Sequence, residues 1–205
     1  MNNTGALESR LGYQFRDPEH LAIALTHRSA AKNHYERMEF LGDAVLNLVI
    51  SAELYQRFPA ASEGELSRLR AHLVKGESLS GLASELALGE HIRLGSGELK
   101  SGGFRRKSIL ADVLESIIGA IYLDAGIEAA REFILRQFET RIHNAQHVKE
   151  LKDPKTRLQE YLQAKALELP SYEVVGTSGK AHNQTFEVSC RVSILETPVI
   201  GTGSS

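Results

Sequence analysis

Acidic side chains recur at helical spacing in two segments of the chain, and their pattern is the one best suited to chemistry. Glu36, Glu39 and Asp43 follow one another at intervals of three and four residues, and Asp112 precedes Glu115 by three. At about 100° per residue of an α-helix, each set falls on one helical face. Both segments are otherwise apolar, so these carboxylates repel one another beside a packed seam unless a cation lies among them. Oxygen ligands of this kind suit Mg²⁺ or Mn²⁺.

Simpler explanations remain open for single residues. Either acidic segment taken alone is more often a solvated helix face, and Glu36 could be solvated or paired with an arginine. Ser62 and Glu65 have the Ser-x-x-Glu spacing of a capping box, which by itself justifies a glutamate there. Phe40 falls near the acidic face of its helix rather than the apolar face. That position favours an interface with a second copy of the chain, although a satellite core within one chain could also accept the ring.

Other cofactor chemistry is excluded by spacing. A di-iron site needs Glu-x-x-His, but here the residue three positions after Glu36 is Glu39. The eight histidines are scattered, which argues against zinc, and no Gly-rich loop followed by Lys-Ser/Thr is present, so no nucleotide cofactor is expected. Cys190 is the single cysteine and excludes an internal disulfide; its alternating strand pattern predicts a small buried side chain.

Composition bounds the class of protein. A chain of 205 residues, 42% of them hydrophobic, suits one domain plus a small module. No run approaches the roughly 18 apolar residues of a membrane span, and the first residues lack the features of a secretory signal. We therefore expect a cytoplasmic protein with no membrane partner. The net charge of −2 argues mildly against RNA as a ligand, because non-specific RNA binders are usually basic.

Helical patterns fill the first part of the chain. We expect residues 1–147 to form an all-α domain, residues 148–153 a linker, and residues 154–205 a small α+β domain. The helices of the first domain are expected near 18–27, 33–58, 62–73, 78–88, 107–123 and 127–144, with a glycine-rich loop over 95–103. The second domain is expected to contain a helix over 155–166 and strands over 172–175, 185–192 and 197–201, an α-β-β-β order.

Several long segments together resemble the bacterial ribonuclease III family, in order and over nearly the whole chain. The segment that opens with Glu36 and runs to Leu46 resembles the signature helix of that family. Further matching segments are Leu25–Ser29, Glu63–Ser67, Gly97–Gly103 and Ile109–Glu115. The run Lys152–Thr156 opens what resembles a double-stranded-RNA-binding domain. The resemblance implies a ribonuclease III fold followed by that RNA-binding module.

The resemblance also implies an activity and its residues. The family cleaves double-stranded RNA with metal-activated water, leaving 5′ phosphates and short 3′ overhangs, and processes ribosomal RNA precursors and structured messenger RNA. The implied ligands for Mg²⁺, or for Mn²⁺ in its place, are Glu39, Asp43, Asp112 and Glu115. Asp43 and Glu115 are expected to be catalytic, with Glu36 and Glu65 near the cleavage centre. Phe40 is expected at the interface of a homodimer, which would align two carboxylate clusters along one cleft.

The second domain is expected to contact duplex RNA by shape, across its minor grooves. By resemblance, Thr156, Gln159 and Glu160 do so from the helix and His182 from a loop. The last helix of the family's module, which begins with a basic cluster, has no counterpart in this sequence, so we expect a weakly folded module with weak RNA binding. A rival hypothesis is a protein of the same fold that binds double-stranded RNA without cutting it; the intact carboxylate spacing favours the enzyme.

Overall fold

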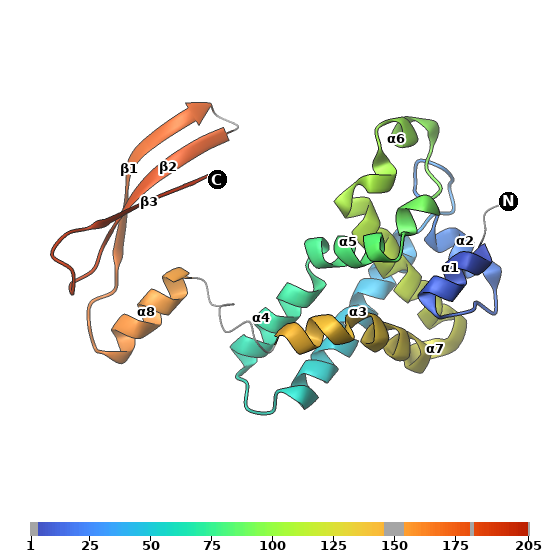
Figure 1. The fold of residues 1–205 in the computed structure, drawn as a ribbon, viewed down its shortest axis with the longest axis horizontal. Helices are drawn as coiled ribbons and strands as arrows, with labels where there is room; N and C mark the ends of the chain where they lie inside the picture. Colours follow the sequence, from blue (N-terminus) through green and yellow to red (C-terminus); the bar gives the residue numbers. More distant parts are fainter. Residues whose placement is uncertain (1–3, 146–153, 181–182, 205) are drawn as a thin grey trace. The chain divides into compact units, whose positions relative to one another are not determined.

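The chain forms two compact units, residues 1–148 and residues 149–205, in a computed structural model that describes residues 4–145, 154–180 and 183–204 (Figure 1). The first unit is all-α, and the second is a helix followed by three antiparallel strands, so the predicted fold class is confirmed. Within these described ranges, no helix is long and apolar enough to cross a membrane.

Seven α-helices and two short 3₁₀ turns make up the described part of the first unit. They are α1 (Thr4–Leu11), α2 (Pro18–Ala24), α3 (Glu36–Arg57), α4 (Glu63–Val74), α5 (Gly76–Glu85), η1 (Leu88–Glu90), α6 (Ser96–Lys100), η2 (Gly103–Arg105) and α7 (Lys107–Ala145). The helix α7 is long but interrupted, because Gly126 has a φ of 82° and a non-helical backbone. This break lies between the two helices expected over 107–123 and 127–144.

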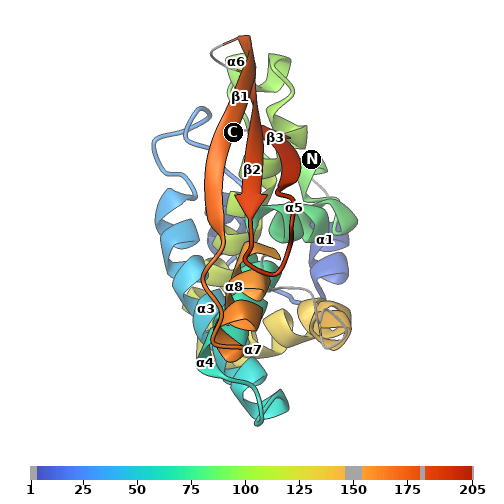
Figure 2. The same ribbon diagram turned by 90° about the vertical axis from the view of Figure 1, so that its left-hand side faces the viewer.

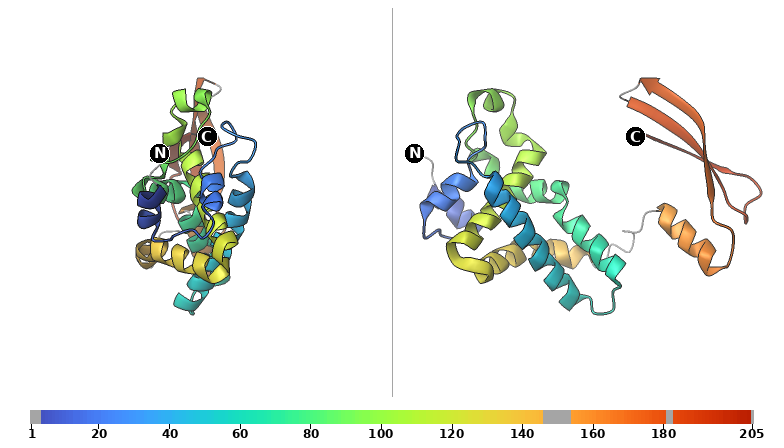
Figure 3. Two further views of the ribbon diagram at one scale, coloured as in Figure 1. Left: turned by 90° about the vertical axis from the view of Figure 1, so that its right-hand side faces the viewer. Right: turned by 180° about the vertical axis from the view of Figure 1, so that it is seen from behind.

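The core forms around α7, against which α3, α5 and α2 all pack. In the right-hand view of Figure 3, α3, in blue, runs diagonally across the first unit. Two glycines allow α3 and α7 to approach until their backbones touch. A Cβ on Gly119 of α7 would lie 2.2 Å from the carbonyl oxygen of Met38, and Gly42 of α3 is equally confined against α7. The backbone contact brings together the two helix faces that carry the acids.

Several helix boundaries differ from the sequence-based expectation. The helix expected from Asn33 begins later, at Glu36: Tyr35 occupies the N-cap of α3 and makes no side-chain capping bond. A tertiary bond fixes this start instead, because the Tyr35 amide donates to the carbonyl of Thr26 at 3.0 Å. The expected loop over 95–103 contains the short helix α6, and α1 was not expected at all. The capping box of α4 is confirmed, with the Ser62 amide donating to the Glu65 carboxylate at 2.8 Å.

The second unit comprises α8 (Pro154–Ala164), β1 (Ser171–Lys180), β2 (Asn183–Arg191) and β3 (Val199–Ser204). The strands are antiparallel with β2 between the other two (Figure 2). A register shift between Val174 and Gly176 bends β1, which is longer than expected. The prediction that Cys190 is buried is wrong, because its side chain is partly exposed. Apolar side chains of the sheet are also exposed to solvent: Val174 is 58% exposed and Ile200 is 50% exposed.

Candidate metal centre

Three carboxylates converge where α3 crosses α7. Glu39 of α3 and Asp112 and Glu115 of α7 each offer an oxygen, and these oxygens lie within 4.8 Å of one another. All three side chains are half-buried. An all-carboxylate set that is partly withdrawn from water is the donor chemistry of hard divalent cations such as Mg²⁺ and Mn²⁺. The residues present therefore fit a divalent ion of that class.

The pKa values of all three carboxylates are raised, so a bound cation would stabilise their charged forms. Burial raises the pKa of Glu39 to about 7, and the negative charges around it, that of Asp112 first, add to the shift. Burial likewise raises the pKa of Glu115 to about 8, with the charge of Asp43 as the next cause. The pKa of Asp112 is also raised by burial, although the hydrogen bond from Tyr35 opposes this. Without a cation, the cluster holds protons near neutral pH.

Asp43 lies beside this group rather than within it. Its side chain is exposed, and one carboxylate oxygen accepts a hydrogen bond from the Asn47 side-chain amide at 2.7 Å. Its charge nevertheless raises the pKa of both Glu39 and Glu115, so it faces the same region. The structure therefore brings three of the four predicted ligands together. The fourth, Asp43, is hydrogen-bonded to Asn47, one turn further along α3.

The other two predicted acids have different surroundings. Glu36 is exposed and pairs with Arg28, whose guanidinium nitrogen lies 3.4 Å from the carboxylate. This is the arginine pairing considered from the sequence, although Glu36 also lines the pocket beside the cluster. Glu65 caps the first turn of α4, where its carboxylate accepts from both the amide and the hydroxyl of Ser62. Within one chain, Glu65 is not among the three converging carboxylates.

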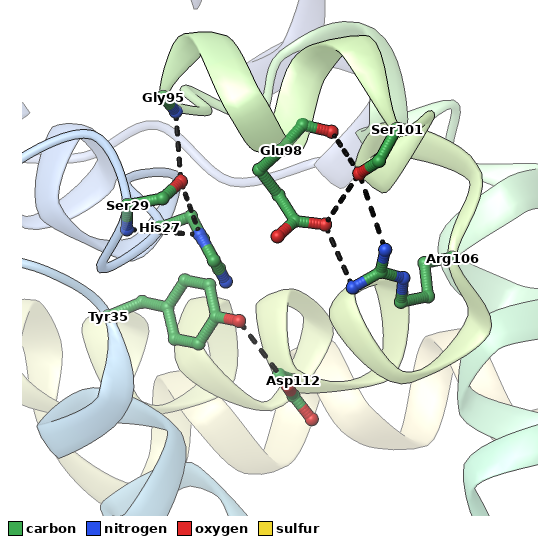
Figure 4. A network of polar contacts seen from close by, with 8 residues as sticks. All are labelled: His27, Ser29, Tyr35, Gly95, Glu98, Ser101, Arg106 and Asp112. Atoms are coloured by element: carbon green, nitrogen blue, oxygen red, sulfur yellow. Dashed lines mark hydrogen bonds and ion pairs between the residues drawn. The ribbon is translucent and has the colours of Figure 1, made fainter.

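An open pocket of 570 Å³ lies against the cluster. Its walls come from α3, from the start of α7 and from the segment that contains α6, and they include Glu36, Glu39, Glu98, Arg106, Ser108 and Asp112. Glu98 accepts from the Arg106 guanidinium at 2.8 Å, and both groups contact the Ser101 hydroxyl (Figure 4). The wall is therefore polar and charged, with arginines beside carboxylates.

Sequence reasoning missed part of this wall. Tyr35 carried no signal beyond its place before the acidic helix, yet its hydroxyl donates to Asp112 at 3.3 Å. Glu98 lies inside a segment that matched the family, and Arg106 inside a short basic run, but neither was assigned to the site. Their spacing from the acidic helices is irregular, so helical periodicity could not have found them.

Phe40 is 80% exposed on α3, so it does not belong to a satellite core of its own chain. Two further large apolar side chains of α3 are exposed, Leu48 at 62% and Tyr55 at 73%. At about 100° per residue these three fall within a sector of roughly 80°. An exposed apolar stripe of this kind is typical of a protein interface.

The residues expected to contact RNA are placed in part. Thr156 and Gln159 are half-buried and Glu160 is exposed, all on α8. The Lys155 ammonium lies 4.5 Å from the centre of the Tyr172 ring, which connects α8 to β1. His182 lies outside the described residues.

Family models match both parts of the chain. Residues 17–142 match the model described as Ribonuclease-III-like, and residues 154–205 match the double-stranded RNA binding motif. The first match covers most of the α-helical unit, from α2 into α7, with the carboxylate cluster, and the second covers the helix and three strands.

Relatives match over nearly the full length. Ribonuclease 3 of Ectopseudomonas mendocina is 56% identical to this chain, and the match covers 99% of this chain and 89% of the relative. Ribonuclease 3 of Vibrio cholerae is 54% identical, and the match covers 97% of this chain and 88% of the relative. The crystal structure of the nuclease domain of ribonuclease III from Campylobacter jejuni, 46% identical, covers 69% of this chain and 97% of its own with a TM-score of 0.66. With the all-α fold and the converging acids in place, the chain belongs to the ribonuclease III family.

Proposed function

We propose that this chain is a divalent-metal-dependent endoribonuclease that cleaves double-stranded RNA. The observation that carries the proposal is the convergence of Glu39, Asp112 and Glu115 within 4.8 Å, in a chain more than 50% identical to relatives named Ribonuclease 3. Mg²⁺ is the proposed ion, with Mn²⁺ able to replace it, because the donors are all carboxylate oxygens.

The proposed mechanism divides the work between the ion and the chain. When bound, a divalent ion would supply a deprotonated water and relieve charge on the phosphodiester. Glu39, Asp112 and Glu115 would hold that ion, with Asp43 as a fourth ligand from the next turn of α3. Arg106 lines the pocket and is held by Glu98 at 2.8 Å, so it offers positive charge to an RNA phosphate. The products are 5′ phosphates and 3′ hydroxyls.

Two copies of the chain are proposed to act together. Phe40 is 80% exposed within an apolar stripe that includes Leu48 and Tyr55, which supports burial of this stripe in a homodimer. A solved structure of the Campylobacter jejuni nuclease domain is described by its flexibility in a region involved in dimer formation. A two-fold dimer carries two carboxylate clusters, one for each RNA strand, and so leaves short 3′ overhangs.

The second unit is proposed to bind the RNA duplex, and its match to the double-stranded RNA binding motif supports this. Thr156, Gln159 and Glu160 of α8 are the proposed contacts, together with His182. Duplex RNA is recognised by the shape of its minor groove, so the unit needs no base-specific donors. The proposed cellular substrates are ribosomal RNA precursors and structured messenger RNA.

The proposal is tested by cleavage of a defined RNA duplex at low salt, with Mg²⁺ and with EDTA. Glu115→Gln keeps the size of the side chain and removes one ligand charge, so it should lower the cleavage rate by about 100-fold or more. Glu128→Gln is the matched control on the same helix, because Glu128 is exposed and lies outside the carboxylate cluster.

Cutting by the native chain and by Glu128→Gln in Mg²⁺ alone, with short 3′ overhangs, is the expected result. A native chain that shifts the duplex in a gel but never cuts it would identify a binding protein instead. Equal cutting in Mg²⁺ and in EDTA would remove the metal from the mechanism.

A further inference from the structure

A buried tyrosine connects the start of α3 to one of the metal ligands. The Tyr35 side chain is 3% exposed, and its hydroxyl donates to Oδ2 of Asp112 at 3.3 Å (Figure 4). Tyr35 precedes the acidic residues of α3, whereas Asp112 belongs to α7. The bond therefore joins the two elements that supply the cluster.

The tyrosine itself is held from several sides. Its amide donates to the carbonyl of Thr26 at 3.0 Å, and its ring centre lies 5.7 Å from that of His27. His27 is fixed in turn, because its Nδ1 accepts from the Ser29 amide at 3.1 Å and lies 2.7 Å from the Ser29 hydroxyl. That hydroxyl accepts from the amide of Gly95 at 2.9 Å. The tyrosine hydroxyl thus occupies a defined point in the pocket wall.

We propose that Tyr35 is a positioning residue of the metal centre, which holds the Asp112 carboxylate in the orientation that converges with Glu39 and Glu115. A carboxylate can accept about four hydrogen bonds or metal bonds, so one bond from the tyrosine leaves the others for an ion. Partners of this kind orient metal ligands in many sites, and their loss weakens metal binding. The inference rests on the metal-binding part of the proposed function.

A second tyrosine–aspartate pair, away from the carboxylate cluster, provides a comparison for the bond between Tyr35 and Asp112. Tyr13 donates to Asp124 at 2.6 Å, and the Asp124 side chain is 1% exposed. Asp124 also accepts from the amides of Arg16 and Asp17, each at 2.9 Å. Its oxygens are therefore occupied by the protein, whereas Asp112 lines an open pocket beside two other carboxylates.

The two pairs give a matched test. Tyr35→Phe and Tyr13→Phe each remove one hydroxyl that donates to a carboxylate and keep the ring. We expect Mn²⁺ binding to the full chain without RNA, followed by electron paramagnetic resonance, to weaken about tenfold in Tyr35→Phe. The Tyr13→Phe variant is expected to bind Mn²⁺ like the native chain, although it melts at a lower temperature.

A second readout separates positioning from a general loss of structure. Cleavage by Tyr35→Phe should require about tenfold more Mg²⁺ for its half-maximal rate and should recover at saturating Mg²⁺, because only the occupancy of the site is reduced. The apparent affinity for duplex RNA in Ca²⁺ should be unchanged.

Three results would overturn the inference. They are an unchanged Mn²⁺ affinity in Tyr35→Phe, a cleavage defect that no Mg²⁺ concentration recovers, and an unfolded Tyr35→Phe chain, since a positioning oxygen is dispensable for folding. A native chain without measurable Mn²⁺ binding would instead refute the proposed metal-dependent function on which the inference depends. The native measurement therefore distinguishes the two failures.

Discussion

A Cβ atom placed on Gly42 would lie 1.7 Å from the carbonyl oxygen of Glu115. The reciprocal contact is almost as close, since a Cβ on Gly119 would lie 2.2 Å from the carbonyl of Met38. Both obstacles are backbone atoms, which no change of rotamer can move. The spacing between the acidic faces of α3 and α7 is therefore set by helix packing, before any side chain of the cluster is placed.

Replacing Gly42 by alanine should separate α3 from α7. The added methyl group raises helix propensity by about 1 kcal/mol, but overpacking against backbone outweighs this gain. We expect Gly42→Ala to lose about 3 kcal/mol of unfolding free energy in urea denaturation, and to bind Mn²⁺ more weakly. Gly76→Ala is the control, because a Cβ there has no neighbour within 4 Å; it should change stability by less than about 1 kcal/mol. Equal effects of both substitutions would contradict the packing argument.

Stability should depend on pH through the carboxylate cluster. Burial and neighbouring charges raise the pKa of Glu39 to about 7 and that of Glu115 to about 8 when the chain is folded. The folded chain therefore holds protons that the unfolded chain releases above about pH 4.5. In EDTA, this contribution to the unfolding free energy is fully present below about pH 4.5 and is lost as the pH rises towards 8. Saturating Mg²⁺ should reduce the loss. Urea denaturation from pH 5 to 8 measures both, and a flat profile in EDTA would oppose the prediction.

Removing one ligand should stabilise the metal-free chain. Glu115→Gln eliminates a half-buried charge among other carboxylates, so we expect it to raise the unfolding free energy in EDTA at pH 8 by on the order of 1 kcal/mol. The same substitution should abolish most cleavage, which makes stability and activity change in opposite directions. Glu128→Gln should alter neither quantity. A Glu115→Gln chain less stable than the native one would show that this carboxylate is structurally required.

The exposed ring of Phe40 should govern self-association. If the ring is buried in a homodimer, Phe40→Ala removes a central apolar contact and should raise the dimer dissociation constant by about 30-fold or more. Sedimentation velocity over a range of protein concentrations measures this change. Leu123→Ala is the control, because Leu123 is 49% exposed on α7 and lies outside the stripe of α3. A native chain that stays monomeric at micromolar concentration would remove the dimer from the proposal.

The sequence predicted best those features that depend on the spacing of residues close together in the chain. The acids of α3 and α7 repeat at helical spacing, so the acidic face of each helix could be predicted. The capping box at Ser62 is equally local. Tyr35 and Glu98 were missed because their roles depend on which distant segment folds against them. The start of α3 was misplaced for the same reason, since a bond to Thr26 rather than a capping side chain defines it.

The hydrogen bond from Asn47 to Asp43 divides the four predicted ligands into two kinds. Three carboxylates already converge, whereas Asp43 is engaged by a neighbour on its own helix at 2.7 Å. A carboxylate can accept about four bonds, so Asp43 could keep the Asn47 amide and still offer oxygens to an ion. Asn47 would then fix the orientation of the fourth ligand from within α3, whereas the other three depend on the packing of α3 against α7.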